Sequence, residues 1–349
     1  MKVIFMAAKN SFLYTFCRMI CALGIMLAMT AHAAPVDRHC LSECTTRIGI
    51  ISAFGAEADI LVEQTQNKRS WNINGNHFTT GQLRGNQVVI VLSGISMVNA
   101  AMVTQLMLDH FRIERLLMSG IAGGVNPNNY VGDVIAAQRW ALPMETYWHR
   151  DGNPPCNKGD SNCVGLQIAT ENGKVRPAFK FNTPAGPLSS GLFMRDTFVQ
   201  NASNGAQGEF RFDFEADPAM LAIVRALKPD LARCGPLNPS RCVHTQPVLR
   251  VGGRAVSIPT FLANADYRAY LYESLQAQAV DMETAAFAQV AYANGVPFLA
   301  FRSLSDLAGG DTGDIGEFFG SGLAEANAAK VTLAFLEAWA NMQRPMFKQ

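Results

Sequence analysis

Two acidic residues stand where a polar side chain is unusual, at the ends of segments that are otherwise apolar. Glu283 closes the run V-D-M-E at the start of an alanine-rich segment with helical spacing, and Asp306 follows the apolar run 298–301. A carboxyl group in such a place can give or take a proton, because burial raises the pKa of an acid. Each residue also has a structural interpretation, Glu283 as a charge at a helix start and Asp306 as a helix N-cap. Spacing alone does not separate these interpretations.

The segments that must position these residues alternate between strand and helix patterns. Strand patterns lie at 47–53, 88–92, 116–118, 131–137, 248–257 and 298–301, and helix patterns at 55–63, 97–111, 218–227, 265–274, 284–293 and 324–342. Asn74-Gly75 marks a hairpin. Strands that alternate with helices predict an α/β fold, a three-layer αβα sandwich around a mixed, mainly parallel twisted sheet. Ligands of such sheets bind at the carboxyl ends of the strands.

The first 33 residues predict a secretory signal peptide. Lys2, Lys9 and Arg18 form a basic leader, 19–29 is apolar, and Ala31-His32-Ala33 is an A-x-A cleavage site. Cleavage of the 349-residue chain would leave residues 34–349, with 26 Lys and Arg against 28 Asp and Glu. We therefore expect an exported, periplasmic or secreted protein, soluble after cleavage, with no basic surface for nucleic acid or membrane.

The mature chain is expected to form one domain with an insertion. Residues 143–214 are rich in Asn, Gly, Pro and Ser and lack clear apolar periodicity. This predicts a loop-rich insertion within the domain, because the segment offers too few periodic apolar residues for a core of its own.

Six cysteines remain after cleavage, as the close pairs Cys40 and Cys44, Cys156 and Cys163, and Cys234 and Cys242. An even count in an exported chain predicts disulfides. Six cysteines allow fifteen connectivities, of which pairing between near neighbours is the simplest. No C-x-x-C, dinucleotide fingerprint, Walker A, G-x-S-x-G or H-E-x-x-H sequence is present, so the sequence predicts neither a metal site nor a cofactor.

Several segments together resemble the nucleoside phosphorylase and nucleosidase superfamily. Within it, the chain looks most like the methylthioadenosine/S-adenosylhomocysteine nucleosidases and the secreted bark-storage-type proteins. The matching segments are IGIISAFGAEADIL (48–61), LSGISMVNAA (92–101), MSGIAGGVNPNNYVGDVI (118–135), SIPTFLANADYRAYL (257–271), AVDMETAA (279–286) and FRSLSDLAGG (301–310). They occur in the family's order, and the resemblance also implies a homo-oligomer, a dimer or a trimer.

The resemblance assigns roles to three carboxyl groups. Asp306 matches the acid that protonates the purine N7, Glu283 the carboxylate that binds the ribose hydroxyls, and Glu57 the residue that orients the attacking water. Cleavage of an N-glycosidic bond passes through a sugar cation, as glycoside hydrolysis does. The leaving purine needs an acid that keeps its proton near neutral pH, and the water needs a carboxylate.

Five further residues match positions near the nucleoside. Met282 packs on the sugar, Ser93 and Gly94 lie near the water, Phe261 stacks on the base, and Leu262 holds the base edge through its backbone. The match at Phe261 requires a gap of one residue. A Ser at a strand end and a lone Phe are also common in turns and cores.

Three functions stay open at this point. We expect an exported purine nucleosidase acting on an adenosine-type nucleoside, with or without a 5′ substituent. A phosphorylase would need a phosphate site with arginine, and family phosphorylases carry that arginine after the first strand, where 54–57 has none and Glu57 would repel phosphate. Arg302 lies inside a strand and resembles a structural arginine. A non-catalytic nucleoside-binding protein for storage or uptake would keep the same pocket.

Overall fold

The computed structural model describes residues 40–149, 167–187, 191–310 and 320–343. All of them belong to one compact unit that begins at His39. The predicted signal peptide and the predicted pair Cys156 and Cys163 lie outside the described residues.

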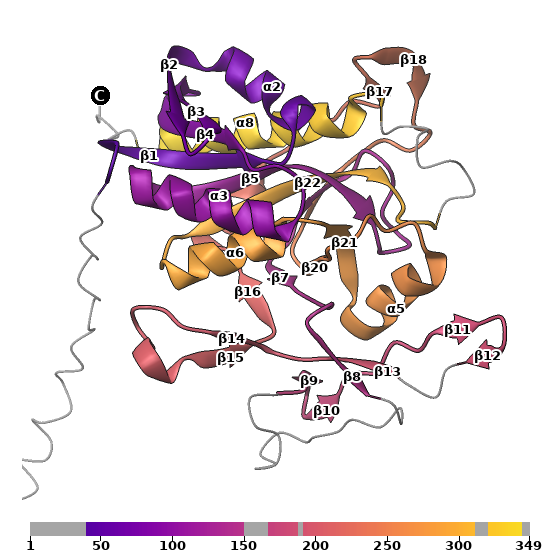
Figure 1. The fold of residues 1–349 in the computed structure, drawn as a ribbon. Coiled ribbons are helices and arrows are strands. Elements are labelled where there is room, and N and C mark those ends of the chain that lie inside the picture. Colours follow the sequence, from indigo (N-terminus) through magenta and orange to yellow (C-terminus); the bar gives the residue numbers. More distant parts are fainter. Residues whose placement is uncertain (1–39, 150–166, 188–190, 311–319, 344–349) are drawn as a thin grey trace, which may run out of the picture. The chain divides into compact units, whose positions relative to one another are not determined.

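Four parallel strands form the centre of the sheet (Figure 1). They are β1 (Glu43–Ser52), β4 (Asn86–Leu92), β5 (Phe111–Gly124) and β22 (Phe298–Asp306). β1 pairs with β4 on one side and with β5 on the other, and β22 pairs with β5. Every residue of β22 is buried, which fits a parallel strand that is covered on both faces.

Antiparallel strands extend this centre in both directions. On one side β2 (Gln66–Ile73) and β3 (Asn76–Leu83) form the predicted hairpin, with Asn74 and Gly75 both at positive φ. On the other side β21 (Ala277–Asp281) pairs antiparallel with β5, followed by β20 (Arg254–Ser257), β7 (Arg139–Ala141) and β16 (Asp213–Glu215). β6 (Val134–Ala136) pairs with β22 and with β19 (Leu249–Val251). The sheet is mixed and largely parallel, as predicted.

Helices cover both faces of the sheet. α2 (Gly55–Gln64) packs against α8 (Leu323–Gln343), and α3 (Met97–His110) packs against α6 (Thr284–Ala293). Figure 1 shows these two helix pairs on opposite sides of the central strands. α4 (Pro218–Ala226) contacts α8, and α5 (Ala265–Leu275) packs on β21. The three layers of the predicted fold are therefore present.

Two strand predictions were wrong in their extent. The segment 248–257 forms two strands, β19 and β20, because Gly252 and Gly253 between them take φ of +110° and +72° and break the extended backbone. The strand expected at 116–118 is the 14-residue β5. Its small residues after 118 have no side chains large enough to give an apolar pattern, yet they stay paired with β22.

The described part of 143–214 consists of short antiparallel pairs. β8 (Thr146–His149) pairs with β13 (Gly191–Met194), β9 (Thr170–Glu171) with β10 (Lys174–Val175), β11 (Asn182–Thr183) with β12 (Gly186–Pro187), and β14 (Thr197–Val199) with β15 (Glu209–Arg211). A 3-10 turn lies at Gly205–Gln207. Phe179 packs edge-on against Tyr267 of α5 and tilted against Tyr270, so this segment is anchored to the body of the protein through α5.

Two of the three predicted disulfides are present. Cys40 is bonded to Cys44, and Cys234 to Cys242, which joins β17 (Cys234–Gly235) to β18 (Asn238–Cys242). Within the described residues, no helix has the length and apolarity that crossing a membrane requires.

Candidate functional site

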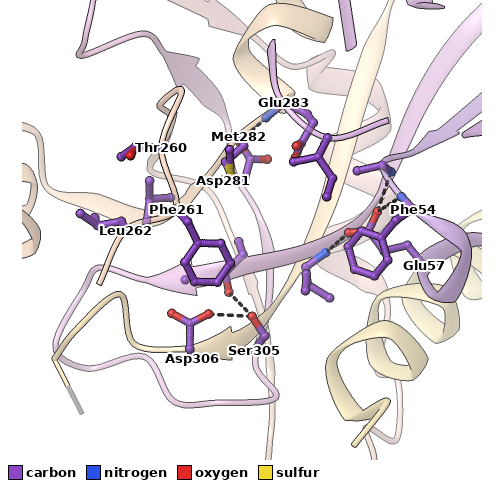
Figure 2. A pocket seen from close by; sticks show the side chains of 16 residues that line it. Phe54, Glu57, Thr260, Phe261, Leu262, Asp281, Met282, Glu283, Ser305 and Asp306 are labelled. Carbon is purple, nitrogen blue, oxygen red and sulfur yellow. Dashed lines mark hydrogen bonds between the residues drawn. The ribbon is translucent and has the colours of Figure 1, made fainter. Parts of the chain in front are cut away.

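A pocket lies at the carboxyl ends of the central strands (Figure 2). Its walls come from the segments that follow β1, β4 and β20, from the last residues of β5, and from the ends of β21 and β22. It encloses about 600 Å³ of empty space, part of which is open to solvent. Concave sites of this kind, with apolar walls and a few polar groups, are typical of small-molecule binding.

The structure brings most of the predicted site residues together. The pocket is lined by Glu57, Phe261, Leu262, Met282, Glu283 and Asp306. Ser93 and Gly94 are not among its described lining residues, although Ile95 of the same segment is. The Ser93 hydroxyl donates to the Gly94 carbonyl at 2.8 Å, and Gly94 has φ of +80°. These two residues therefore shape the turn that carries Ile95.

Glu57 is buried in the first turn of α2 and points back into the pocket floor. Its Oε2 accepts hydrogen bonds from the N–H groups of Ala53 at 2.6 Å and Phe54 at 3.3 Å. Its Oε1 accepts from the N–H of Ile121 at 2.8 Å. These three backbone donors hold the carboxylate of Glu57 in one position. A side chain that orients a small ligand must be held in this way.

Arg302 of β22 connects the carboxyl groups of the site. Its guanidinium lies 3.4 Å from Glu57 Oε1, 2.8 Å from Asp281 Oδ2 and 3.2 Å from Glu283 Oε2. The Arg302 side chain is 0% exposed. The sequence interpretation placed Arg302 in the strand without a partner, and the structure shows that its side chain joins Glu57, Asp281 and Glu283, which all line the pocket.

Glu283 occupies the N-cap position of α6, but its side chain does not cap the helix. Its Oε1 instead accepts from the N–H of Ser96 at 2.8 Å. Ser96 has φ of +84°, a conformation that costs a non-glycine residue about 1–3 kcal/mol. Asp281 does the capping, since it accepts from the N–H of Thr284 at 3.2 Å. The Glu283 side chain therefore makes no capping hydrogen bond, although it lies at the start of α6 as predicted, and it lines the pocket.

The charges of this cluster alter each other's ionisation. Burial raises the pKa of Glu283 to about 7, against the opposing effect of Arg302 and with support from the negative charge of Asp281. Burial also raises the pKa of Glu57, while Arg302 and the three backbone donors oppose that rise. Burial disfavours the charged form of Arg302, but Asp281, Glu283 and Glu57 together keep its pKa above the usual value. Glu283 is thus poised to change its charge near neutral pH.

Asp306 is the last residue of β22 and lies on the wall of the pocket. Its Oδ2 accepts from the Ser305 hydroxyl at 2.8 Å, and its Oδ1 accepts from the N–H of Ala308 at 2.7 Å. The helix-cap interpretation of Asp306 is wrong, because residues 307–310 form a turn and no helix begins there. Figure 2 shows Asp306 beside the Phe261 ring in this view, with Glu57 beyond Ser305.

Sequence reasoning did not assign Asp281, Phe54, Ile95, Ile121 or Thr260 to the pocket that they line. Asp281 stood in the noted run V-D-M-E, two residues before Glu283, which was the available signal. Phe54, Ile95 and Thr260 lie in loops and Ile121 lies in β5, and nothing in the type of these four residues marks them as pocket residues. Among the described residues, no group of three or more His, Cys, Asp and Glu has the geometry of a metal site.

Comparison with known protein families identifies the superfamily. The family model described as the Phosphorylase superfamily matches residues 47–338, most of the chain. The chain belongs to the phosphorylase superfamily. It is 26% identical over 265 residues to the 5′-methylthioadenosine/S-adenosylhomocysteine nucleosidase of Bacillus anthracis, an alignment that covers 75% of this chain and 87% of that relative. The predicted resemblance to this superfamily and to these nucleosidases is confirmed, and the likeness to bark-storage-type proteins stays a prediction.

Solved structures of nucleosidases have a fold similar to that of this chain. The 5′-methylthioadenosine/S-adenosylhomocysteine nucleosidase of S. pneumoniae, bound to the transition-state inhibitor MT-ImmA, superposes with a TM-score of 0.56 at 25% identity, covering 84% of this chain and 100% of that one. Futalosine hydrolase of Helicobacter pylori superposes with a TM-score of 0.56 at 18% identity, covering 85% of this chain and 98% of that one. The second likeness concerns the fold alone.

Proposed function

We propose that this member of the phosphorylase superfamily is an exported purine nucleosidase. It hydrolyses the N-glycosidic bond of an adenosine-type nucleoside, with or without a 5′ substituent. The observation that carries the proposal is the charge of the pocket. Among its described lining residues are the carboxyl groups of Glu57, Asp281, Glu283 and Asp306, and no Lys, Arg or His.

This charge distribution favours water over phosphate as the nucleophile. Arg302 contacts three of these carboxyl groups, and its guanidinium is already shared among them. A phosphate ion would have to enter beside several negative charges, with no arginine among the described lining residues to neutralise it. Water carries no charge, and a fixed carboxylate such as that of Glu57 can orient it by accepting a hydrogen bond.

Each step of the proposed reaction has a side chain in a suitable place. Asp306 donates a proton to the purine N7 and so turns the base into a neutral leaving group. Glu283 accepts hydrogen bonds from the ribose hydroxyls, while Met282 packs against the sugar. The developing sugar cation is stabilised by the negative carboxylates around it, and Glu57 directs the water and accepts its proton. Burial raises the pKa of Glu57, which makes it a stronger base than an exposed glutamate.

Export is part of the proposal. The motivation is the predicted signal peptide at 1–33 together with the disulfides Cys40–Cys44 and Cys234–Cys242, since disulfides persist in oxidising compartments. Fractionation of cells that express the full chain, followed by N-terminal sequencing of the product, tests it. We expect the mature protein outside the cytoplasm with an N-terminus at Ala34.

The test of the activity uses purified residues 34–349 with adenosine, 5′-methylthioadenosine and inosine, each with and without inorganic phosphate. Chromatography of the products should find free base and free sugar in both conditions. A sugar 1-phosphate and an absolute need for phosphate would make the protein a phosphorylase. Tight binding of a nucleoside without release of base would make it a binding protein.

A further inference from the structure

The buried cluster around Arg302 has too few positive charges. One guanidinium faces Glu57, Asp281 and Glu283, whose side chains are 1%, 1% and 6% exposed. Three carboxylates and one arginine would leave a net charge of −2 out of contact with water. Uncompensated buried charge costs several kcal/mol, so such groups hold protons instead. Before a ligand binds, the cluster is therefore stabilised when one of its acids holds a proton.

Asp281 has the most fixed position of the three acids. It accepts hydrogen bonds from the hydroxyls of Ser257 and Thr284, and from the N–H groups of Glu283 at 3.3 Å and Thr284 at 3.2 Å. It also holds Arg302 Nε at 2.8 Å. These contacts come from β20, β21, α6 and β22, so Asp281 sets the orientation of the guanidinium between the other two carboxyl groups.

Glu283 has the fewest hydrogen-bond donors and the most exposed side chain of the three acids. It has two donors, the N–H of Ser96 and the guanidinium of Arg302. The charged groups that face it are Arg302 on β22, Asp281 on β21 and Glu57 on α2, and its pKa is about 7. Near neutral pH, about half of the molecules therefore carry a proton on Glu283.

We propose that Asp281 is a positioning residue that holds Arg302 between Glu57 and Glu283, and that nucleoside binding expels to solvent the proton held by Glu283. The inference rests on the proposed function, because it takes the ribose hydroxyls as the ligand of Glu283. It adds that binding of the sugar releases a proton from Glu283. It also adds that Asp281, which takes no part in the proposed bond cleavage, sets the pH range in which this release occurs.

The proton balance follows from the donors involved. Each ribose hydroxyl brings a hydrogen that Glu283 accepts on both oxygens only in its ionised form, because protonation turns one oxygen into a donor and weakens the acceptor strength of the group. Binding therefore converts a carboxyl group into a carboxylate with two new hydrogen bonds, and one proton leaves. A ligand without the 2′ and 3′ hydroxyls has no such preference and releases none.

The experiment measures proton release on binding. The probe is an adenosine C-nucleoside, whose carbon–carbon link to the base cannot be hydrolysed, titrated calorimetrically in buffers with different ionisation enthalpies. At pH 7 we expect release of about half a proton per ligand, rising towards one at lower pH and vanishing above about pH 9. The same C-nucleoside without its 2′ and 3′ hydroxyls is the ligand control.

Asp281→Asn tests the positioning role. The negative charge of Asp281 raises the pKa of Glu283, so its removal should move the midpoint of proton release to lower pH by about one unit. The matched control is Asp133→Asn, since Asp133 is also buried, is held by an arginine Nε at 2.7 Å and is absent from the pocket wall. Its midpoint should equal that of the wild type, whatever its effect on stability.

The outcomes separate the two hypotheses. Binding of the C-nucleoside without proton release in the wild type would overturn the inference and leave the proposed function standing. An equal midpoint in Asp281→Asn and Asp133→Asn would refute the role of Asp281. If no nucleoside binds at all, the proposed function fails and the inference fails with it. If Asp281→Asn does not fold, the number of protons released by the wild type still tests whether nucleoside binding expels the proton of Glu283.

Discussion

Replacing Asp306 by asparagine removes an acidic proton and changes little else in the structure. The amide oxygen of the new side chain would still accept from the N–H of Ala308, which lies 2.7 Å from the present Oδ1. The amide nitrogen would take the place of Oδ2 and donate to the Ser305 oxygen, while the Ser305 hydroxyl turns to the Ala122 carbonyl at 3.3 Å. Both of these hydrogen bonds have a replacement, so we expect their change to cost about 1 kcal/mol of stability or less.

The effect on turnover should be far larger. General acid catalysis contributes about 10²–10⁴-fold, or about 3–5 kcal/mol of barrier, and an amide cannot supply the proton. Base release, ligand affinity and thermal midpoint are measured together on Asp306→Asn. The control is Asp217→Asn, because Asp217 caps α4 outside the pocket through the N–H of Met220 at 2.8 Å, and asparagine caps about as well. Full activity of Asp306→Asn would refute the catalytic role, and a large fall in midpoint would assign the lost activity to unfolding.

Three further predictions concern the cluster and the disulfides. Gly120→Ala should cost about 1–3 kcal/mol of stability and reduce turnover, because the new Cβ would overlap both Arg302 Nη1 and Glu57 Oε1. Thermal melts and base-release assays measure both effects. The control is Gly320→Ala, whose new Cβ would meet nothing within 4 Å. Since the folded pKa of Glu283 is raised from 4.5 to about 7, its contribution to stability is present below pH 4.5 and is lost as the pH rises towards 7. Glu283→Gln should therefore flatten the fall of thermal midpoint with pH, and an unchanged slope would contradict this. Mass spectrometry of the native exported protein should find no alkylatable thiol among the four cysteines 40, 44, 234 and 242, and free thiols there would exclude the disulfides.

The parts of the fold that sequence predicted well are those with strong local patterns. The short apolar runs of β1, β4 and β22 are typical of buried strands. Asn74-Gly75 predicts a hairpin because both residues readily take the positive φ that the turn requires. The short strands within 143–214 were missed because two to four residues are too few to show a period of two. The segment also contacts the rest of the protein through residues distant in the sequence, such as Phe179 with Tyr267 of α5, and these contacts are not visible in the local sequence.

The candidate site divides in a similar way. Glu283 and Asp306 were singled out because each is an acid at the end of an apolar segment, which is a local signal, whereas Glu57 was assigned only through the resemblance to a known family. Arg302 was harder, because its partner Glu57 lies 245 residues away in the sequence. An arginine in an apolar strand shows only that some acid must meet it, not which one. Asp281 was missed as a separate residue because the run V-D-M-E contains two acids, and only their different hydrogen-bond partners in the structure separate their roles.

Gly120 explains why this charge cluster can exist at all. Gly120 of β5 is the register partner of Arg302 in β22, so a side chain at position 120 would take up the face of the sheet on which the guanidinium lies. At position 120 the absence of a Cβ makes room for the guanidinium of Arg302 and the carboxylate of Glu57 to meet. The small residues of β5 that gave no apolar pattern are thus the ones that admit polar groups into the core. The cluster that results has more negative than positive charges. In the proposed reaction, the positive charge that develops on the sugar would be attracted to these negative charges. The same feature that weakens the folded protein would thereby stabilise the transition state.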